Sequence, residues 1–452
     1  MHIEVGLFDH MVLQRNRKNV SEASFSGTSA ANGPVMVTVR RDGKAVKGFA
    51  SVKAGMSYRG RLTGCLKGIP SGGPYEIELA AGAESMTVRD VLVGDVWILG
   101  GQSNMQGCGY FPKKRLPSDP LVRAFYMDDR WAVAKDPIHN MWDCVDVVHV
   151  DLKGGMRTPK PDPEWGVCPG PEFGNEMRRI SGVPQGLIAC AHGGTSMTQW
   201  DPDRKKEGGK SLYGAMIRRV VKNGGRVAGL LWYQGCSDAS PEAAKLFTGR
   251  MKEFVAALRR DCGDKALPVA MVQIGRVIGS SDEGAADWNS IQDQQRLLQG
   301  EIKNITIVPA IDLPLDDNIH VSGAGHYVLG VRLAYAMNVL REGRKAGLPP
   351  IALKKVTIET VHGLGVLVVE FENVCGKLCS GSRPTGFVII NDKSSVNHFG
   401  IQLDGPCARI RSTLSTVALA GCKLRYGYGP TPYCNIMDEA GRPLPVFGPV
   451  SL

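Results

Sequence analysis

Short apolar runs recur between residues 91 and 345, with helical stretches between them, and this alternation constrains the fold more than any other feature of the sequence. The runs occupy residues 96–99, 186–190, 229–232, 269–272 and 305–308. One helical stretch begins at Ser240-Pro241, a typical helix start, and continues with apolar residues at helical spacing. Strands alternating with helices predict a mostly parallel sheet that helices cover on both faces.

The sequence changes character on either side of this region. Alternating runs punctuated by Gly, Pro and Asn, such as residues 35–39 and 75–79, are typical of β-strands, and such runs return at 355–358 and 366–371. A chain of 452 residues also exceeds the usual size of one domain. We therefore predict an N-terminal β module over 1–90, an α/β catalytic domain over 91–345 and a C-terminal β module over 346–452.

Composition excludes several classes of protein. The net charge is +10, but the basic residues are scattered, and the clusters at 113–115 and 204–206 are short and lack aromatic neighbours, so nucleic acid is not an expected partner. No membrane insertion is expected, because the most apolar stretch, 91–99, is interrupted by Asp95. Twelve cysteines are too few for a disulfide scaffold, and no residue set implies a metal or an organic cofactor.

A serine directly follows the first apolar run of the α/β region. In Gly101-Gln102-Ser103-Asn104-Met105 the glycine permits a sharp turn after residues 96–99. The carboxyl end of a strand at the start of a helix is where open α/β sheets place sites, with backbone N–H groups directed at a developing anion. Ser103 is therefore a candidate nucleophile, and a serine hydroxyl needs a base to become reactive at neutral pH.

The segment Asp317-Asn318-Ile319-His320 provides that base. A spacing of three residues in a loop lets the Asp317 carboxylate hold one imidazole nitrogen of His320, which leaves the other nitrogen for the serine. Two alternatives stay open at this stage. Asp316 is a second candidate to orient the imidazole, and His326 is a second candidate base, although it lies in the following helix and has no acid three residues before it.

Two further segments carry candidate donors for an oxyanion. Gly193, in His-Gly-Gly-Thr after the strand that ends near residue 191, permits a close approach of its backbone N–H, with Gly194 as the near alternative. Gln234 follows the strand 230–233 and offers a side-chain amide, with a plain core amide as the alternative role. All these segments follow strands, so one edge of the sheet is expected to collect them.

In combination, these motifs resemble the SGNH hydrolase superfamily, specifically its sialate O-acetylesterase-like carbohydrate esterases. The motifs are Gly-Gln-Ser-Asn-Met, Gly-Gly-Thr, Trp-Tyr-Gln-Gly and Asp-x-x-His, in that order. Residues 7–15, 90–97 and 425–428 also resemble family segments, so the similarity extends over nearly the whole chain. The chain departs from the family pattern at Cys236, where a glutamate is usual and would supply a supporting carboxylate, and at His192, where a larger aromatic or a small residue is expected.

The resemblance implies a flavodoxin-like three-layer α/β/α SGNH hydrolase core with flanking β-sandwich-like modules. It implies Ser103 as the nucleophile, His320 as general base and acid, and Asp317 as the residue that orients His320. The oxyanion donors would be the Ser103 and Gly193 N–H groups and the Gln234 amide. The expected activity removes O-acetyl groups from a sugar or glycan, with O-acetylated sialic acid as the favoured substrate. Acetylated xylan or another plant glycan is the alternative substrate, and a carbohydrate-binding protein on a weakly active esterase core is the alternative of another class.

Two residues are candidates for substrate contact. Arg276 follows the strand at 269–274 and is a candidate to anchor a sugar carboxylate, with a plain surface position as the alternative. Trp200 is a candidate to line the pocket, with a core role as the alternative. The loop expected over residues 107–166, rich in Pro, Trp and charge, would influence the choice of sugar. The resemblance implies a secreted, periplasmic or lysosomal protein, although the first residues do not read as a signal peptide; the sequence leaves the oligomeric state open.

Overall fold

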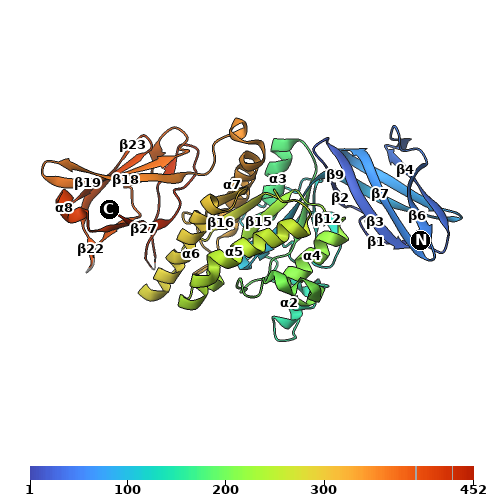
Figure 1. The fold of residues 1–452 in the computed structure, drawn as a ribbon, viewed down its shortest axis with the longest axis horizontal. Helices are drawn as coiled ribbons and strands as arrows, with labels where there is room; N and C mark the ends of the chain where they lie inside the picture. Colours follow the sequence, from blue (N-terminus) through green and yellow to red (C-terminus); the bar gives the residue numbers. More distant parts are fainter. Residues whose placement is uncertain (392–393, 430) are drawn as a thin grey trace. The chain divides into compact units, whose positions relative to one another are not determined.

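The computed structural model describes residues 1–391, 394–429 and 431–452, and the chain forms two compact units (Figure 1). The first unit contains Met1–Gly193, Thr198–Leu231 and Glu253–Leu267. The second contains Gly194–Met197, Trp232–Lys252 and Pro268–Leu452. Within the described ranges, no helix combines the length and the apolar character that crossing a bilayer requires.

The N-terminal part of the first unit is an antiparallel sheet, drawn in blue in Figure 1. Its strands run in the spatial order β1 (His2–Val5), β3 (Val20–Thr28), β7 (Arg61–Pro70), β6 (Val52–Tyr58), β4 (Gly33–Arg41), β8 (Gly72–Ala81) and β9 (Glu84–Gly101), and the short β5 (Lys44–Ala45) pairs with β4. The strands alternate as the sequence predicts: Val35, Val37 and Val39 of β4 are fully buried, whereas the residues between them are partly exposed.

The long strand β9 continues from this antiparallel sheet into parallel pairing. Residues 92–94 pair in parallel with β2 (Val12–Gln14), and residues 95–99 pair in parallel with β14 (Gln185–Ala189). Next come β11 (Val122–Phe125), parallel to β14, and β12 (Trp131–Val133), antiparallel to β11, while β15 (Gly229–Tyr233) also pairs with β9. Helix α3 (Gly170–Ser181) packs on β14 and β11. The predicted mixed α/β fold with a large sheet is confirmed.

The stretch from 107 to 166, expected as a loop, is only partly one. Besides β11 and β12 it contains β10 (Gly109–Tyr110), α2 (Val148–Asp151), a 3-10 turn at Met141–Asp143 and β13 (Trp165–Val167). The run that forms β11 contains Arg123 and therefore does not read as an apolar strand, but the structure buries this arginine and pairs it with Asp90 at 2.9 Å.

The second unit contains the remaining α/β elements. β16 (Val269–Gln273) pairs in parallel with β17 (Ile305–Pro309), and every residue of both strands is buried. Helices α6 (Asp282–Glu301) and α7 (Gly323–Glu342) pack against these strands (Figure 1). Helix α5 (Pro241–Asp261) starts in this unit, and α4 (Leu212–Lys222) belongs to the first unit.

Residues after 350 form further β-structure around one core in the second unit. One sheet has the order β18 (Ala352–Val361), β19 (Leu364–Glu372), β24 (Cys407–Ser412), β23 (His398–Asp404); another has the order β22 (Ser395–Val396), β21 (Phe387–Ile390), β25 (Lys423–Tyr426), β27 (Phe447–Ser451). β20 (Leu378–Cys379) pairs with β26 (Met437–Asp438), and α8 spans Thr416–Leu419. Gln273, the last residue of β16, links that strand to the β-structure after residue 350. Its amide nitrogen donates to the Val446 carbonyl and its amide oxygen accepts from the Val446 N–H, both at 2.9 Å. The boundaries of the three predicted domains stay a prediction.

A buried ion pair fixes β9 where its pairing changes from antiparallel to parallel. The Asp95 carboxylate is fully buried and accepts from Arg15 Nε at 3.0 Å and from Arg15 Nη2 at 2.8 Å. Gly94 precedes it, and a side chain there would lie 1.9 Å from the Pro184 carbonyl oxygen. Arg15 therefore holds β9 at the point where the strand passes close to Pro184, just before β14 begins.

We expect Arg15→Ala to destabilise the first unit, because it leaves the Asp95 carboxylate buried without its cation. The cost should be about 3 kcal/mol, the lower end of what removal of one partner of a buried ion pair costs. Thermal unfolding followed by circular dichroism measures it. Arg17→Ala, an exposed arginine two residues further on, is the matched control. Equal unfolding midpoints for the two variants would contradict this role.

Candidate active site

The Ser103 turn follows β9 directly. Gly101 has φ 131°, a conformation that favours glycine, and Gln102 is extended before the short helix α1 (Ser103–Gln106) begins. Ser103 is partly exposed, whereas the next two residues are buried. Its backbone N–H lies in the first turn of α1, where N–H groups have no acceptor within the helix. The hydroxyl is therefore presented at the carboxyl end of β9 beside an N–H that can donate.

Gly193 lies beside Ser103 in the first unit. The backbone N–H of His192 donates to the Gly101 carbonyl at 3.0 Å, which brings the segment after β14 next to the Ser103 turn. A Cβ atom built on Gly193 would lie 3.4 Å from Ser103 Cβ and 3.1 Å from Gln106 Oε1. The Gly193 N–H already donates to Gln106 Oε1 at 2.7 Å. This N–H is thus close to the serine, and a neighbouring side chain occupies it.

His192, the residue before Gly193, forms a pair with a second histidine. His192 Nδ1 is 2.9 Å from Nδ1 of His149, on α2, and the rings stack with centroids 5.1 Å apart. Both imidazoles are buried; burial lowers the pKa of His192 to about 4, with Lys153 acting in the same direction. Burial also lowers the pKa of His149 well below its usual range, as do His192 and Arg219. One Nδ1 donates and the other accepts, so the accepting ring must be neutral, and the lowered pKa values of both histidines keep both rings neutral near pH 7.

In the second unit, Asp317 and His320 form a close pair in the loop between β17 and α7. Asp317 Oδ2 is 2.6 Å from His320 Nδ1, and Oδ1 accepts from the backbone N–H groups of Ile319 at 2.8 Å and His320 at 2.7 Å. Burial acts to raise the pKa of Asp317, but these hydrogen bonds outweigh it and lower the pKa below its ordinary value. The ionised carboxylate holds Nδ1 as the donor, so Nε2 is the basic nitrogen.

The two alternatives for this pair occupy different places. Asp316 Oδ2 accepts from the Gly323 N–H at the start of α7, at 3.3 Å. His326 lies inside α7, and its ring nitrogens have no hydrogen-bond partner among the described residues. Burial lowers the pKa of His326 to about 3. The carboxylate bound to the His320 imidazole is therefore that of Asp317.

Gln234 follows β15 and is fully buried in the second unit. Its Nε2 donates to the Thr195 carbonyl at 3.1 Å and to Asp238 Oδ2 at 2.5 Å, while Oε1 has no hydrogen-bond partner within the described chain. Both amide hydrogens thus have acceptors. The sequence did not reveal Asp238 as the partner of this amide, because the turn after Gln234 brings the two side chains together and no motif shows it. At position 236, burial raises the pKa of the Cys236 thiol to about 12.

The two candidate substrate contacts differ in their surroundings. Trp200 is fully buried in the first unit and packs edge-on against Phe254, with ring centroids 6.3 Å apart, which favours the core role that the sequence left open. Arg276 follows β16 and is partly exposed, and its buried Nε has no hydrogen-bond partner in the described part of the chain. No cluster of three or more metal-ligating side chains occurs among the described residues.

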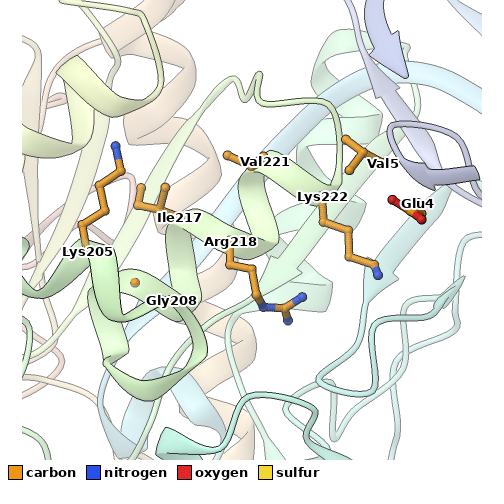
Figure 2. Close-up of a pocket in the computed structure, with 9 residues that line it drawn as sticks. Glu4, Val5, Lys205, Gly208, Ile217, Arg218, Val221 and Lys222 are labelled. Atoms are coloured by element: carbon orange, nitrogen blue, oxygen red, sulfur yellow. The ribbon is translucent and has the colours of Figure 1, made fainter. Parts of the chain in front are cut away.

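A separate pocket of about 390 Å³ lies in the first unit, beside α4 (Figure 2). Three cations line it, but acids neutralise them: Arg218 bonds Asp129 and Asp146, Lys222 lies 3.4 Å from Asp129, and Lys205 lies 2.9 Å from Asp261. None of the predicted site residues lines this pocket, which is therefore distinct from the Ser103 turn.

Comparison with known proteins places these residues in context. A family model described as "Carbohydrate esterase, sialic acid-specific acetylesterase" matches residues 93–339, more than half of the 452 residues. The chain is 29% identical over 264 residues to a probable carbohydrate esterase of Arabidopsis thaliana, which covers 53% of this chain and 89% of that protein. It is 27% identical over 345 residues to the sialate O-acetylesterase of Homo sapiens, covering 67% of this chain but only 63% of the human protein.

A solved structure shares the fold along nearly the whole chain. The crystal structure of a carbohydrate acetylesterase from Xanthomonas citri matches with a TM-score of 0.72 and 24% identity, covering 99% of this chain and 98% of that one. The β-rich regions on both sides of the α/β elements are thus included in the shared fold.

We expect the free energy of unfolding to fall as the pH is lowered from about 6.5 towards 4. The folded pKa of His192 lies below the unfolded value of about 6.5, so the unfolded chain binds the proton first, and stability present above pH 6.5 is lost towards pH 4. One histidine contributes up to about 1.4 kcal/mol per pH unit. Urea titrations should give a shallower loss for His192→Gln than for wild type, and an unchanged loss for the exposed His2→Gln. Equal pH dependence in all three proteins would contradict the assignment.

Proposed function

This chain belongs to the sialic acid-specific acetylesterase family of carbohydrate esterases, and we propose that it removes O-acetyl groups from sialic acids through a Ser103–His320–Asp317 triad. The observation that carries the proposal is the 2.6 Å contact between Asp317 and His320 Nδ1, which leaves Nε2 as a base. The presentation of Ser103 at the end of β9 supports it. The proposed core is the flavodoxin-like three-layer SGNH hydrolase fold, flanked by β-sandwich-like modules.

The proposed reaction passes through an acetyl-enzyme. His320 Nε2 takes the proton from Ser103 Oγ as Oγ attacks the acetyl carbonyl, and the bond to the sugar oxygen then breaks as His320 returns the proton to that oxygen. Water, activated by His320 in the same way, attacks the acetyl group and releases acetate and free Ser103. Asp317, ionised over the working pH range, stabilises the imidazolium that forms in both steps.

The proposed oxyanion donors are the Ser103 and Gly193 N–H groups and the Gln234 amide. Two of them already have acceptors: Gln106 Oε1 accepts from Gly193, and the Thr195 carbonyl and Asp238 accept from Gln234. In this scheme the carbonyl oxygen of the substrate replaces Gln106 Oε1 at the Gly193 N–H and shares with the Thr195 carbonyl the hydrogen that the Gln234 amide donates to it. The donors stay satisfied without substrate and need little reorientation when charge develops.

The proposed sugar is an O-acetylated sialic acid. The human relative is named a sialate O-acetylesterase, and the family description names sialic acid. A sialic acid carries a carboxylate, and Arg276, with its buried Nε lacking a partner among the described residues, is our candidate to bind it. Trp200 is fully buried, so any influence on the substrate would pass through packing. Acetylated xylan is the alternative that the substrate test includes.

We expect Ser103→Ala to fold as wild type does and to lose nearly all release of acetate, because the alanine side chain lacks the oxygen that attacks the acetyl carbonyl. Acetate release from 9-O-acetylated sialic acid and from acetylated xylo-oligosaccharides tests chemistry and substrate together. Release from sialic acid alone supports the proposed substrate, and release from xylan alone keeps the mechanism and replaces the substrate. Activity of Ser103→Ala close to that of wild type, or a wild type silent on both esters, would contradict the proposal.

Neighbouring aspartates allow a matched test of the orienting role. Asp317→Asn should lower kcat by roughly 10²–10⁴-fold, because an amide does not hold Nδ1–H in the required tautomer or stabilise the imidazolium. Asp316→Asn alters a contact to the start of α7 and should change kcat much less. Hydrolysis of p-nitrophenyl acetate measures both. Equal losses in the two variants would argue against Asp317 as the specific partner of His320.

A further inference from the structure

Asp238 is a fully buried carboxylate that connects two segments of the proposed site. It ends the 3-10 turn Cys236–Asp238, which directly follows Gln234-Gly235. Its two oxygens lie 3.1 and 3.0 Å from the backbone N–H of Met197, and Oδ2 also accepts from Gln234 Nε2. One side chain therefore holds both the Gln234 amide and the short segment Gly194–Met197 that follows Gly193.

The other hydrogen bonds of Gln234 show why its amide nitrogen, and not its amide oxygen, faces this carboxylate. The Thr195 carbonyl accepts the second Nε2 hydrogen at 3.1 Å, and the Gln234 backbone carbonyl is fixed by Gln295 Nε2 at 2.8 Å. Both contacts on the amide nitrogen are acceptors, so the nitrogen and not the oxygen must face Asp238 and Thr195. An amide at position 238 would replace one of the two acceptor oxygens by a donor and remove the negative charge, so it would hold this orientation more weakly.

We propose that Asp238 is the positioning residue of the oxyanion site: its carboxylate sets the orientation of the Gln234 amide and fixes Gly194–Met197. Position 236, where a glutamate with a supporting carboxylate is expected, is a cysteine in this chain, and Asp238 takes over that supporting role. Asp238 acts through Gln234 and does not itself touch the substrate. The inference rests on the proposed function, because it gives Gln234 a role in the transition state.

Burial and hydrogen bonding act on the Asp238 carboxylate in opposite directions. Burial is the largest influence and raises the pKa of Asp238 above its ordinary value, against the hydrogen bonds from Gln234 and Met197 and the charge of Arg250 on α5, which lower it. The thiol of Cys236 is a second titratable group close to Asp238, and burial keeps it protonated. A carboxylate buried in this way keeps its charge only where hydrogen-bond donors contact its oxygens.

A double-mutant cycle between Asp238→Asn and Gln234→Ala tests the proposal on p-nitrophenyl acetate. Loss of one oxyanion donor costs roughly 10²–10³-fold in kcat, so we expect Asp238→Asn to lower kcat by a large part of that factor with KM changed less than about threefold. In the Gln234→Ala background, Asp238→Asn should cost clearly less than in wild type, because the part of its effect that passes through the Gln234 amide is already lost. A full, additive loss in that background would overturn the inference.

Two controls keep the result specific. Cys236→Ser changes the same turn and should retain wild-type kcat and KM, since the thiol makes no contact with the Gln234 amide among the described hydrogen bonds. If Asp238→Asn does not fold, Asp238→Glu carries the same cycle, because it keeps the charge and moves the oxygens. Failure of the proposed function would appear as an active Ser103→Ala, whereas failure of this inference would appear as an additive cycle beside an inactive Ser103→Ala.

Discussion

The first unit depends on one strand, β9, which pairs antiparallel with some neighbours and parallel with others. Its first half pairs with β8 in an antiparallel sheet, and its second half pairs in parallel with β14 and ends at the Ser103 turn. A register error of one residue would turn the whole second half over and move Ser103 away from its place. The Arg15–Asp95 ion pair, located where the pairing changes, helps to specify that register, because it places a buried charge against the Arg15 guanidinium.

The residues of the proposed site lie on backbone segments that leave strands, and hydrogen bonds between neighbours hold these segments within each unit. Gln106 holds the Gly193 N–H, His149 holds the His192 ring, and Asp238 holds both Gln234 and Met197. These contacts have a common purpose in our account. The two proposed donors among them, the Gly193 N–H and the Gln234 amide, have acceptors before substrate arrives, which avoids the cost of buried unpaired donors and keeps each donor close to its working direction.

Sequence reasoning reached the residues whose chemistry shows in a short motif and missed those that act through tertiary contacts. Asp317 and His320 are three residues apart, so a loop brings them together whatever surrounds it, and the structure gives their contact at 2.6 Å. Nothing in the sequence joins His149 to His192, 43 residues apart, because packing alone creates that pair. Asp238 was visible two residues beyond the expected glutamate, but only burial and the two acceptors around Gln234 reveal what it does. Likewise, the charged Arg123 concealed β11, since its pairing with Asp90 depends on the fold.

The central claim is that Ser103 carries the acetyl group during the reaction, and trapping the intermediate tests it most directly. Wild-type protein would be mixed with p-nitrophenyl acetate, quenched in acid within the first turnover and digested, and the peptides analysed by mass spectrometry. The account predicts one added acetyl group on the peptide that contains Ser103, absent from the Ser103→Ala protein. An acetyl group on another residue, or turnover in Ser103→Ala at the wild-type rate, would contradict it.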